Sequence, residues 1–342
     1  METVKFTIPS KVYHISQIAT GFHVLKKQGC PIEIIDRTAD RENPFYGLPV
    51  ACAEYMGQKI IYDLWDGYQD PVDMKKCLEQ CDFYFKRSFS AEKNAQLFPE
   101  YRDKMYPLGF NYHVTYPGSP VNEPKLKSFL KPFLGKAPEP YFVPEVFEGS
   151  PRQKDGGDVK ILFQAQLWDV RDPDMCPEMA EECDYINRTR MEILRTLRET
   201  YGDAFFGGLK DTPLARELAP ELIVPEKYTE RRKYLKLVHS CDICIGTMGL
   251  HESIGWKTAE YIAAAKAIVN ERFHYTVTGD FGEGKNYLPF NTARECIEAV
   301  RVLAESPEKR HEMQKANAEY YQNYLKPEVL VKNTLELVEK NI

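Results

Sequence analysis

Two glutamates eight positions apart, Glu252 and Glu260, bracket the start of a predicted helix within residues 241–269. These residues read CDICIGTMGLHESIGWKTAEYIAAAKAIV. An apolar run typical of a buried strand opens into a segment with three glycines, a helix follows, and a turn of small residues leads to a second apolar run. A glycine-bearing loop that feeds a helix N-terminus offers backbone N–H groups to a phosphate. The stretch therefore predicts an anion-binding site beyond the carboxyl end of a strand.

The spacing of the two carboxylates suits a nucleotide-activated sugar. At about 1.5 Å of rise per residue, eight helical positions span about 12 Å, roughly the reach from a ribose across a diphosphate to an attached sugar. Carboxylate oxygens accept hydrogen bonds from hydroxyl groups. We expect Glu260, two turns into the helix, to hold the ribose and Glu252 to touch the transferred sugar. Gly249, His251 and Ser253 are expected to line the same site.

Three basic residues are candidates for binding the diphosphate. Lys257 lies one turn into the predicted helix, Arg171 follows the strand expected to end near residue 164, and Arg188 lies on the next helix. A fixed cation stabilises the charge that develops on a departing diphosphate without a metal ion. We predict Lys257 as the catalytic cation and no metal cofactor. For each of the three, an ordinary surface charge is the alternative.

Two further patterns could indicate metal ligands. Asp172 and Asp174 flank Pro173 and could bind Mg²⁺ or Mn²⁺. Proline between two aspartates is also common in turns, and we interpret the pattern as a turn. Cys241 and Cys244 are not followed by a second pair at zinc-ribbon spacing, so we interpret them as core residues.

Polar residues follow three predicted strands of the first half of the chain. His14 precedes the first helix, Asp66 follows the strand expected to end at residue 64, and residues 86–88 follow the next strand. Carboxyl ends of parallel strands share one edge of a sheet, where ligands bind. We predict that Asp66 orients or deprotonates an acceptor hydroxyl, with His14 or His113 in reserve. A turn-capping role for Asp66 is the alternative.

Short apolar runs alternate with helical patterns along the chain, which is typical of α/β folds with parallel sheets. In the first half we predict strands at 4–8, 32–36, 59–64, 82–85 and 105–110, with helices at 15–28 and 73–80. In the second half we predict strands at 159–164, 204–207, 242–245 and 267–269, with helices at 181–201, 229–239 and 254–265. A charged helical tail, 292–342, is broken at Ser306-Pro307 and at Pro327.

The order of strand, glycine loop, E-x7-E, alanine-rich turn and strand resembles the retaining glycosyltransferases of the GT-B fold, in particular the family 4-like enzymes. The matching elements are 242–246, Gly249, Glu252, Glu260 and 261–269. The resemblance implies two Rossmann-like doubly wound domains that face each other across a cleft, a nucleotide sugar bound to the C-terminal half, and retention at the anomeric carbon.

A weaker resemblance covers the start of the chain. Thr20, Gly21 and Phe22 are similar to the glycine loop of the acceptor-binding half, which implies that Gly21 belongs to the ligand site. Two departures stand out: Ala19 and Thr20 replace the usual first glycines, and residues 165–167 read Ala-Gln-Leu where the family has Gly-Arg-Leu. With the second departure, the resemblance does not identify which cation binds the phosphate.

The resemblance and a Pro-rich segment at 116–157 together predict the domain organisation. We expect an acceptor-binding domain at 1–115, an interdomain connection at 116–157 and a nucleotide-sugar-binding domain at 158–310. The C-terminal helices, 311–342, are expected to return to the first domain.

Composition narrows the function classes. A chain of 342 residues, 43% hydrophobic and 28% charged, is typical of a folded two-domain protein. A net charge of -6 argues against a nucleic-acid partner. No apolar stretch reaches the roughly 18 to 20 residues of a membrane span, and residues 1–10 are not typical of a signal peptide. Nine scattered cysteines indicate reduced thiols, so we expect a cytoplasmic protein.

These observations predict an enzyme, a hexosyltransferase-like glycosyltransferase that uses a UDP- or GDP-linked sugar. Its acceptor would be a glycan or lipid-linked glycan, as in surface polysaccharide assembly, and a lipid-linked acceptor would bring peripheral membrane association. Two alternatives remain open: a nucleotide-sugar epimerase or hydrolase of the same fold, and a non-catalytic glycan-binding protein.

Overall fold

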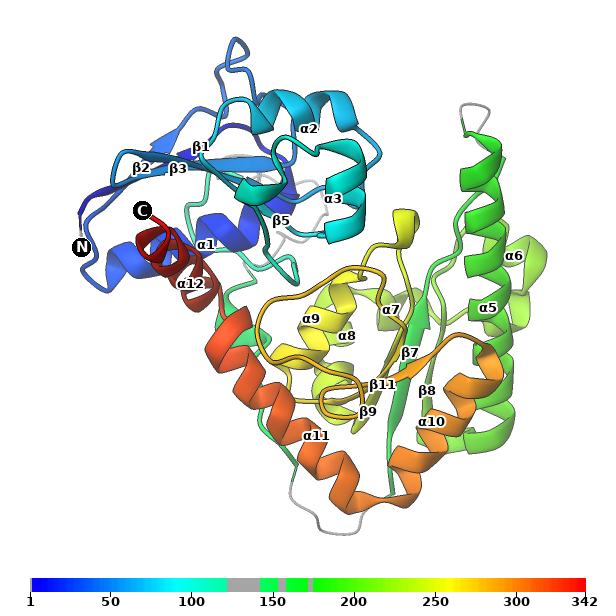
Figure 1. Ribbon diagram of the computed structural model, residues 1–342. Helices are drawn as coiled ribbons and strands as arrows, with labels where there is room; N and C mark the ends of the chain where they lie inside the picture. The colour runs from blue at the N-terminus through cyan, green and yellow to red at the C-terminus, as the bar shows by residue number, and fades with distance from the viewer. Residues whose placement is uncertain (1, 122–141, 153–157, 172–174) are drawn as a thin grey trace, which may run out of the picture. The chain divides into compact units, whose positions relative to one another are not determined.

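The computed structural model describes residues 2–121, 142–152, 158–171 and 175–342. The chain forms two compact α/β units (Figure 1). Unit 1 comprises Met1–Phe147, Tyr275–Gly279 and Gln322–Ile342, and unit 2 comprises Glu148–His274 and Asp280–Tyr321. The predicted turn at Asp172 and Asp174 lies outside the described residues.

Unit 1 is built on a mixed sheet of six strands in the order β2-β1-β3-β4-β5-β6. The strands are β1 (Val4–Ile8), β2 (Ile32–Asp36), β3 (Val50–Tyr55), β4 (Gln58–Asp63), β5 (Phe83–Lys86) and β6 (Met105–Pro107). Only β3 runs antiparallel to its neighbours among these strands. The carboxyl ends of the other five strands therefore lie at one edge of the sheet.

Strand β3 is missing from the sequence-based prediction. Its residues VACAEY include alanine and glutamate, which are depleted in strands. The strand forms because Met56 and Gly57, both at positive φ (52° and 74°), turn the chain directly into β4. This two-residue geometry is typical of a β-hairpin.

Helices cover both faces of the unit 1 sheet (Figure 1). Helices α1 (Ser16–Lys27) and α12 (Pro327–Lys340) pack on one face, around a core that includes Phe6, Phe22 and Tyr62. Helix α2 (Pro71–Leu78) packs on the other face. Shorter helical segments complete the described unit: η1 (Tyr13–Ile15), α3 (Ala91–Leu97), η2 (Arg102–Lys104), η4 (Pro144–Val146) and η8 (Tyr321–Leu325), which spans the junction with unit 2.

Gly21 lies inside α1 and not in a loop. A Cβ atom at this position would lie 2.3 Å from the carbonyl oxygen of Pro327 and 2.7 Å from Cγ2 of Val331, both in α12. The structure therefore contradicts the assignment of Gly21 to a ligand-binding glycine loop. The residue is glycine because the two helices approach each other closely at this point.

Replacing Gly21 by alanine is expected to lower the free energy of unfolding of unit 1 by about 1–3 kcal/mol, because the added methyl group forces α1 and α12 apart. Urea unfolding measures the change. Gly282→Ala is the control, since a Cβ there meets no atom within 4 Å. Equal stability of the two variants would contradict this account of the glycine.

Unit 2 is built on a parallel sheet in the order β11-β10-β9-β7-β8. The strands are β7 (Ile161–Ala165), β8 (Phe205–Leu209), β9 (Ile243–Gly246), β10 (Ala267–Glu271) and β11 (Leu288–Phe290). The helices are α5 (Pro177–Tyr201), η5 (Gly202–Ala204), α6 (Pro213–Leu218), η6 (Pro220–Leu222), α7 (Glu226–Thr229), α8 (Arg231–Ser240), η7 (Leu250–Glu252), α9 (Trp256–Ala263), α10 (Ala293–Glu305) and α11 (Pro307–Tyr320). Strand β11 is missing from the sequence-based prediction because it is short, carries Pro289 and lies at the sheet edge.

Two boundaries differ from the predicted division. Unit 1 continues to Phe147 and does not end at 115, because the N–H of Thr115 donates to the carbonyl of Phe142 (2.7 Å) and the rings of Tyr112 and Phe147 pack edge to face at 5.0 Å. The tail is divided between the units. Helix α11 belongs to unit 2, and α12 belongs to unit 1.

Candidate functional site

The sheet of unit 2 reverses its order between β7 and β9. From β7 the chain continues to β8 on one side and returns to β9 on the other. Ligands of open α/β sheets bind beyond the carboxyl ends of the strands at such a switch point. The loops that follow Ala165 and Gly246 both start at this edge.

Gly246 permits close packing where the loop begins. A Cβ atom there would lie 1.9 Å from Oδ1 of Asn270. That oxygen accepts a hydrogen bond from the Thr258 hydroxyl (2.8 Å). The end of β9 is thereby packed against β10 and α9, which fixes where the loop leaves the sheet.

Glu252 lies in a strained part of this loop. His251 and Glu252 both have left-handed backbone conformations, with φ of 59° and 58°. Such conformations in residues other than glycine persist only where the surroundings hold them. The N–H of Glu252 donates to the Glu182 carboxylate (2.9 Å), and its own carboxylate lies 3.6 Å from Nδ1 of His274. The half-exposed side chain of Glu252 is thus held at the carboxyl edge of the sheet.

Much of the backbone of this loop is already hydrogen-bonded within unit 2. Four of its N–H groups already donate within unit 2: Met248 to Glu271 (2.8 Å), Gly249 to the carbonyl of Ser253 (2.8 Å), Glu252 to Glu182, and Ser253 to the carbonyl of Leu250 (3.2 Å). These four N–H groups are thus used inside the unit, and we look to the side chains at this edge for further anion-binding groups.

Lys257, on the first turn of α9, brings a cation to the switch point. Its ammonium group donates to the carbonyl of Gln164 at the end of β7 and lies 5.2 Å from the centre of the Tyr234 ring. Burial lowers the pKa of Lys257 to about 8, with Glu260 opposing the shift and Arg190 and Arg231 adding to it. The lysine thus links the start of α9 to the end of β7.

Glu260 is buried and paired. Both of its carboxylate oxygens accept hydrogen bonds from the guanidinium of Arg231, the first residue of α8, one of them at 3.0 Å. The side chain of Glu260 is 3% exposed and that of Arg231 is 30% exposed. The structure therefore places a cation between solvent and the carboxylate that the sequence assigns to the ribose.

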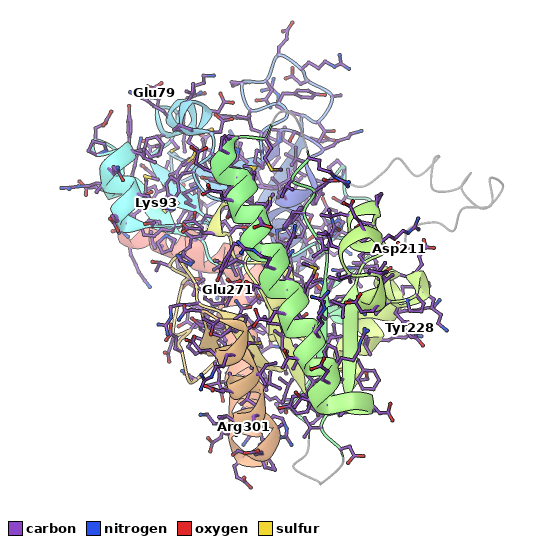
Figure 2. The ribbon with its side chains drawn as sticks, turned by 90° about the vertical axis from the view of Figure 1, so that its right-hand side faces the viewer. Glu79, Lys93, Asp211, Tyr228, Glu271 and Arg301 are labelled. Atoms are coloured by element: carbon purple, nitrogen blue, oxygen red, sulfur yellow. The ribbon has the colours of Figure 1, made fainter. Side chains whose placement is uncertain are left out.

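Arg190 of α5 ties the two loops of the switch point together. Its guanidinium donates to the carbonyl of Gln166 (2.6 Å), the carbonyl of Met248 (2.8 Å) and the hydroxyl of Thr247 (3.0 Å). Burial lowers the pKa of Arg190 to about 10, and the nearby Glu271 opposes this shift. Figure 2 shows Glu271 beside α5, which carries Arg190.

Burial raises the pKa of Glu271, although the N–H of Met248 and Arg190 both oppose the shift.

The sequence-based prediction of the site does not include Arg190, although the spacing of the buried residues of α5 indicates that this arginine faces the core. Cys183, Ile186, Arg190, Ile193 and Leu197 share the buried face of one helix at spacings of three and four.

The other two predicted cations lie in exposed ion pairs. Arg171 pairs with Asp169 (2.8 Å) and Glu217 (2.9 Å), and Arg188 pairs with Asp184 (2.9 Å). Arg188 is two residues from Arg190, which places it on the opposite side of the same helix. The structure does not bring either residue together with Lys257.

In unit 1, the structure brings Asp66, His14 and Arg87 to one edge of the sheet. Arg87 is buried and forms an ion pair with Asp66, whose side chain is 35% exposed. Burial lowers the pKa of His14, against the attraction of Asp66 and with added repulsion from Arg87 and His113. The ring of His113 lies 5.8 Å from that of Tyr13. The role of this group in binding an acceptor stays a prediction.

A buried ion pair supports the loop that carries Asp66. Lys86 and Asp63 are both fully buried, and the lysine donates to the Asp63 carboxylate and to the carbonyl of Gly67, each at 2.8 Å. Asp63 also accepts from the hydroxyl of Tyr84 (2.7 Å) and the N–H of Trp65 (2.8 Å). These contacts fix the connection between β4 and α2.

In the part of the chain that the structure describes, no three His, Cys, Asp or Glu side chains come together as metal ligands. Within the same residues, no helix has both the length and the apolar character of a membrane span.

Comparisons with known proteins find similarity in structure only. No model of a known protein family matches the sequence, and no curated protein matches it. Solved structures that resemble the chain include HepE from Anabaena in complex with UDP, at 10% identity over 99% of this chain and 100% of that one, with a TM-score of 0.46.

A glycosyltransferase from Rickettsia africae is 13% identical over 98% of this chain and 97% of that one, with a TM-score of 0.44. A protein from Listeria monocytogenes described as a putative UDP-N-acetylglucosamine 2-epimerase is 11% identical over 98% of this chain and 95% of that one, with a TM-score of 0.43. At these values the similarity concerns the general α/β architecture and carries no information about substrate or activity.

Proposed function

We propose that this chain is a glycosyltransferase of the GT-B type that transfers a sugar from a UDP- or GDP-linked donor to a hydroxyl acceptor. In the reaction the anomeric bond to the diphosphate breaks, a bond to the acceptor oxygen forms, and the acceptor proton passes to a base. Unit 2 holds the donor and unit 1 the acceptor, a glycan or lipid-linked glycan. Retention at the anomeric carbon is part of the proposal.

The observation that carries the proposal is the convergence at the switch point of unit 2. Lys257, Arg231 and the strained loop with Glu252 all belong to elements that start or end at the carboxyl edge of one parallel sheet. Two cations beside a carboxylate that can accept from hydroxyl groups suit a ligand with a diphosphate and several hydroxyls. In this arrangement Lys257 neutralises the departing diphosphate.

For Asp66 we propose an orienting role toward the acceptor hydroxyl. Its carboxylate is already paired with Arg87, and this contact fixes where the carboxylate lies at the sheet edge. The partly exposed carboxylate presents its remaining acceptor capacity at the sheet edge.

A thermal-shift panel of UDP, GDP, CMP, ADP and dTDP tests the donor class, because a ligand that binds only the folded state raises its melting temperature. The sugar conjugates of the best nucleotide are then incubated with and without glycan acceptors. Turnover that needs an acceptor supports a transferase. Full turnover without any acceptor would instead indicate the epimerase or hydrolase, and glycan binding without nucleotide binding would indicate the non-catalytic protein.

Transfer is expected to continue in excess EDTA, because Lys257 and Arg231 supply the positive charge that a divalent cation would supply. Product formation is measured with EDTA alone and after adding Mn²⁺ back. Activity that disappears with the chelator and returns with Mn²⁺ would move the diphosphate site to Asp172 and Asp174.

Binding of a nucleoside diphosphate is expected to weaken as the pH rises through about 8, since Lys257 loses its proton there and not near its ordinary value of 10.5. The stability effect has the opposite sign. Between these two pH values the unfolded chain binds more protons than the folded one, so the contribution of Lys257 to stability rises with pH. Calorimetric titration of UDP or GDP at several pH values tests this. A dissociation constant that stays constant across pH 8 would contradict the lysine's role.

A further inference from the structure

The carboxylate of Glu260 is paired inside unit 2. Both oxygens accept from one guanidinium, and the side chain is 3% exposed. A side chain this little exposed, with both oxygens paired to Arg231, offers a ribose hydroxyl little access. Removing one partner of a buried ion pair leaves the other charge unpaired, which is strongly unfavourable. A bound ribose supplies only neutral hydroxyl groups as replacement partners.

Arg231 is the more exposed partner of this pair. It is the first residue of α8, and 30% of its side chain is exposed. The ion pair with Glu260 holds its guanidinium in place. The guanidinium carbon lies 5.8 Å from the centre of the Tyr234 ring, and the ammonium of Lys257 lies 5.2 Å from the same centre. Two cations from different helices thus lie near the same buried ring.

Arg231 and Lys257 bring positive charge to the edge of the sheet where the loop after β9 begins. The N–H groups of Met248, Gly249, Glu252 and Ser253 are used within unit 2. Arg171 and Arg188 are held in exposed ion pairs. A guanidinium with a fixed orientation binds phosphate oxygens in a forked geometry that a lone lysine cannot provide.

We infer that Arg231 binds the diphosphate of the donor together with Lys257, and that Glu260 is a positioning residue that holds Arg231 and does not contact the ribose. The inference rests on the proposed function. It replaces the ribose role that the sequence pattern assigns to Glu260.

The test is a calorimetric comparison of three probes: UDP, uridine and 2′,3′-dideoxy-UDP, or the guanosine series if GDP is the better ligand. The variants are Arg231→Met, Glu260→Gln and the double variant. Arg232→Met is the matched control, since Arg232 is the adjacent, exposed arginine. Arg231→Lys separates charge from forked geometry and is expected to fall between the parent and Arg231→Met.

The expected result is a roughly ten- to a hundredfold weaker affinity of Arg231→Met for UDP, with uridine binding and the control unchanged. Glu260→Gln should also weaken UDP binding, and the double variant should bind UDP no more weakly than Arg231→Met, because the two residues act as one unit. The parent and Glu260→Gln should discriminate equally between UDP and the dideoxy analogue.

Two results would overturn the inference while leaving the proposed function intact. In one, Glu260→Gln alone loses discrimination against the dideoxy analogue and Arg231→Met keeps full affinity, so that the glutamate contacts the ribose. In the other, Arg231→Met lowers the melting temperature but binds UDP like the parent, so that the pair is only structural. If the parent binds no nucleoside diphosphate at all, the proposed function itself fails.

Discussion

Replacing Lys257 by methionine is expected to lower kcat about a hundred- to a thousandfold, the size of effect seen when one fixed group that stabilises transition-state charge is removed. Methionine keeps much of the side-chain length and removes the charge. Burial makes the charged form of the lysine less favourable, which lowers its pKa to about 8. Loss of the charge therefore relieves a desolvation cost, and we expect the melting temperature to stay the same or rise.

The measurements are initial rates with saturating donor and a calorimetric melting curve. Lys236→Met is the matched control, because Lys236 lies on α8 of the same unit with its side chain exposed. It should behave like the parent in both. A Lys257→Met variant that is fully active would exclude the lysine from the reaction. A variant that loses activity only in proportion to its loss of folded protein would make the lysine structural.

Arg190→Met is expected to destabilise unit 2 by roughly 3–5 kcal/mol, the cost of removing one partner from a buried charge network. The carbonyls of Gln166 and Met248 lose a donor, and Glu271 keeps a buried carboxylate without the nearby cation. Because these carbonyls belong to the loops after β7 and β9, nucleotide binding should weaken as well. Arg190→Lys keeps the charge but cannot reach all three acceptors, so an intermediate loss is expected.

Denaturant unfolding and calorimetric titration with the nucleotide from the panel measure the two effects. Arg188→Met is the control, since Arg188 lies on the same helix in an exposed ion pair with Asp184. Surface substitutions of this kind usually change stability by no more than about 0.5 kcal/mol. If Arg190→Met matches this control in stability and in nucleotide affinity, then Arg190 does not anchor the loops.

Much of the fold is predictable from local pattern. The predicted strands at 4–8 and 32–36 coincide with β1 and β2, and the breaks at Ser306-Pro307 and Pro327 separate α10, α11 and α12. Apolar periodicity and proline act within a few residues, so such features do not depend on distant parts of the chain. Strands β3 and β11 are not predicted from the local pattern. Strand β3 forms because of the hairpin turn at Met56 and Gly57, and β11 forms by pairing at the edge of the sheet.

The sequence by itself determined where the site begins: a glycine loop after a buried strand, with Lys257 on the helix that follows it. Only the tertiary structure decided what each side chain there does. Arg231, 29 positions before Glu260, occupies that carboxylate, and Pro327 explains Gly21 from the far end of the chain. Pairing of buried charges and close helix contacts depend on which distant segments meet. Residue spacing along one helix contains no information about such partners.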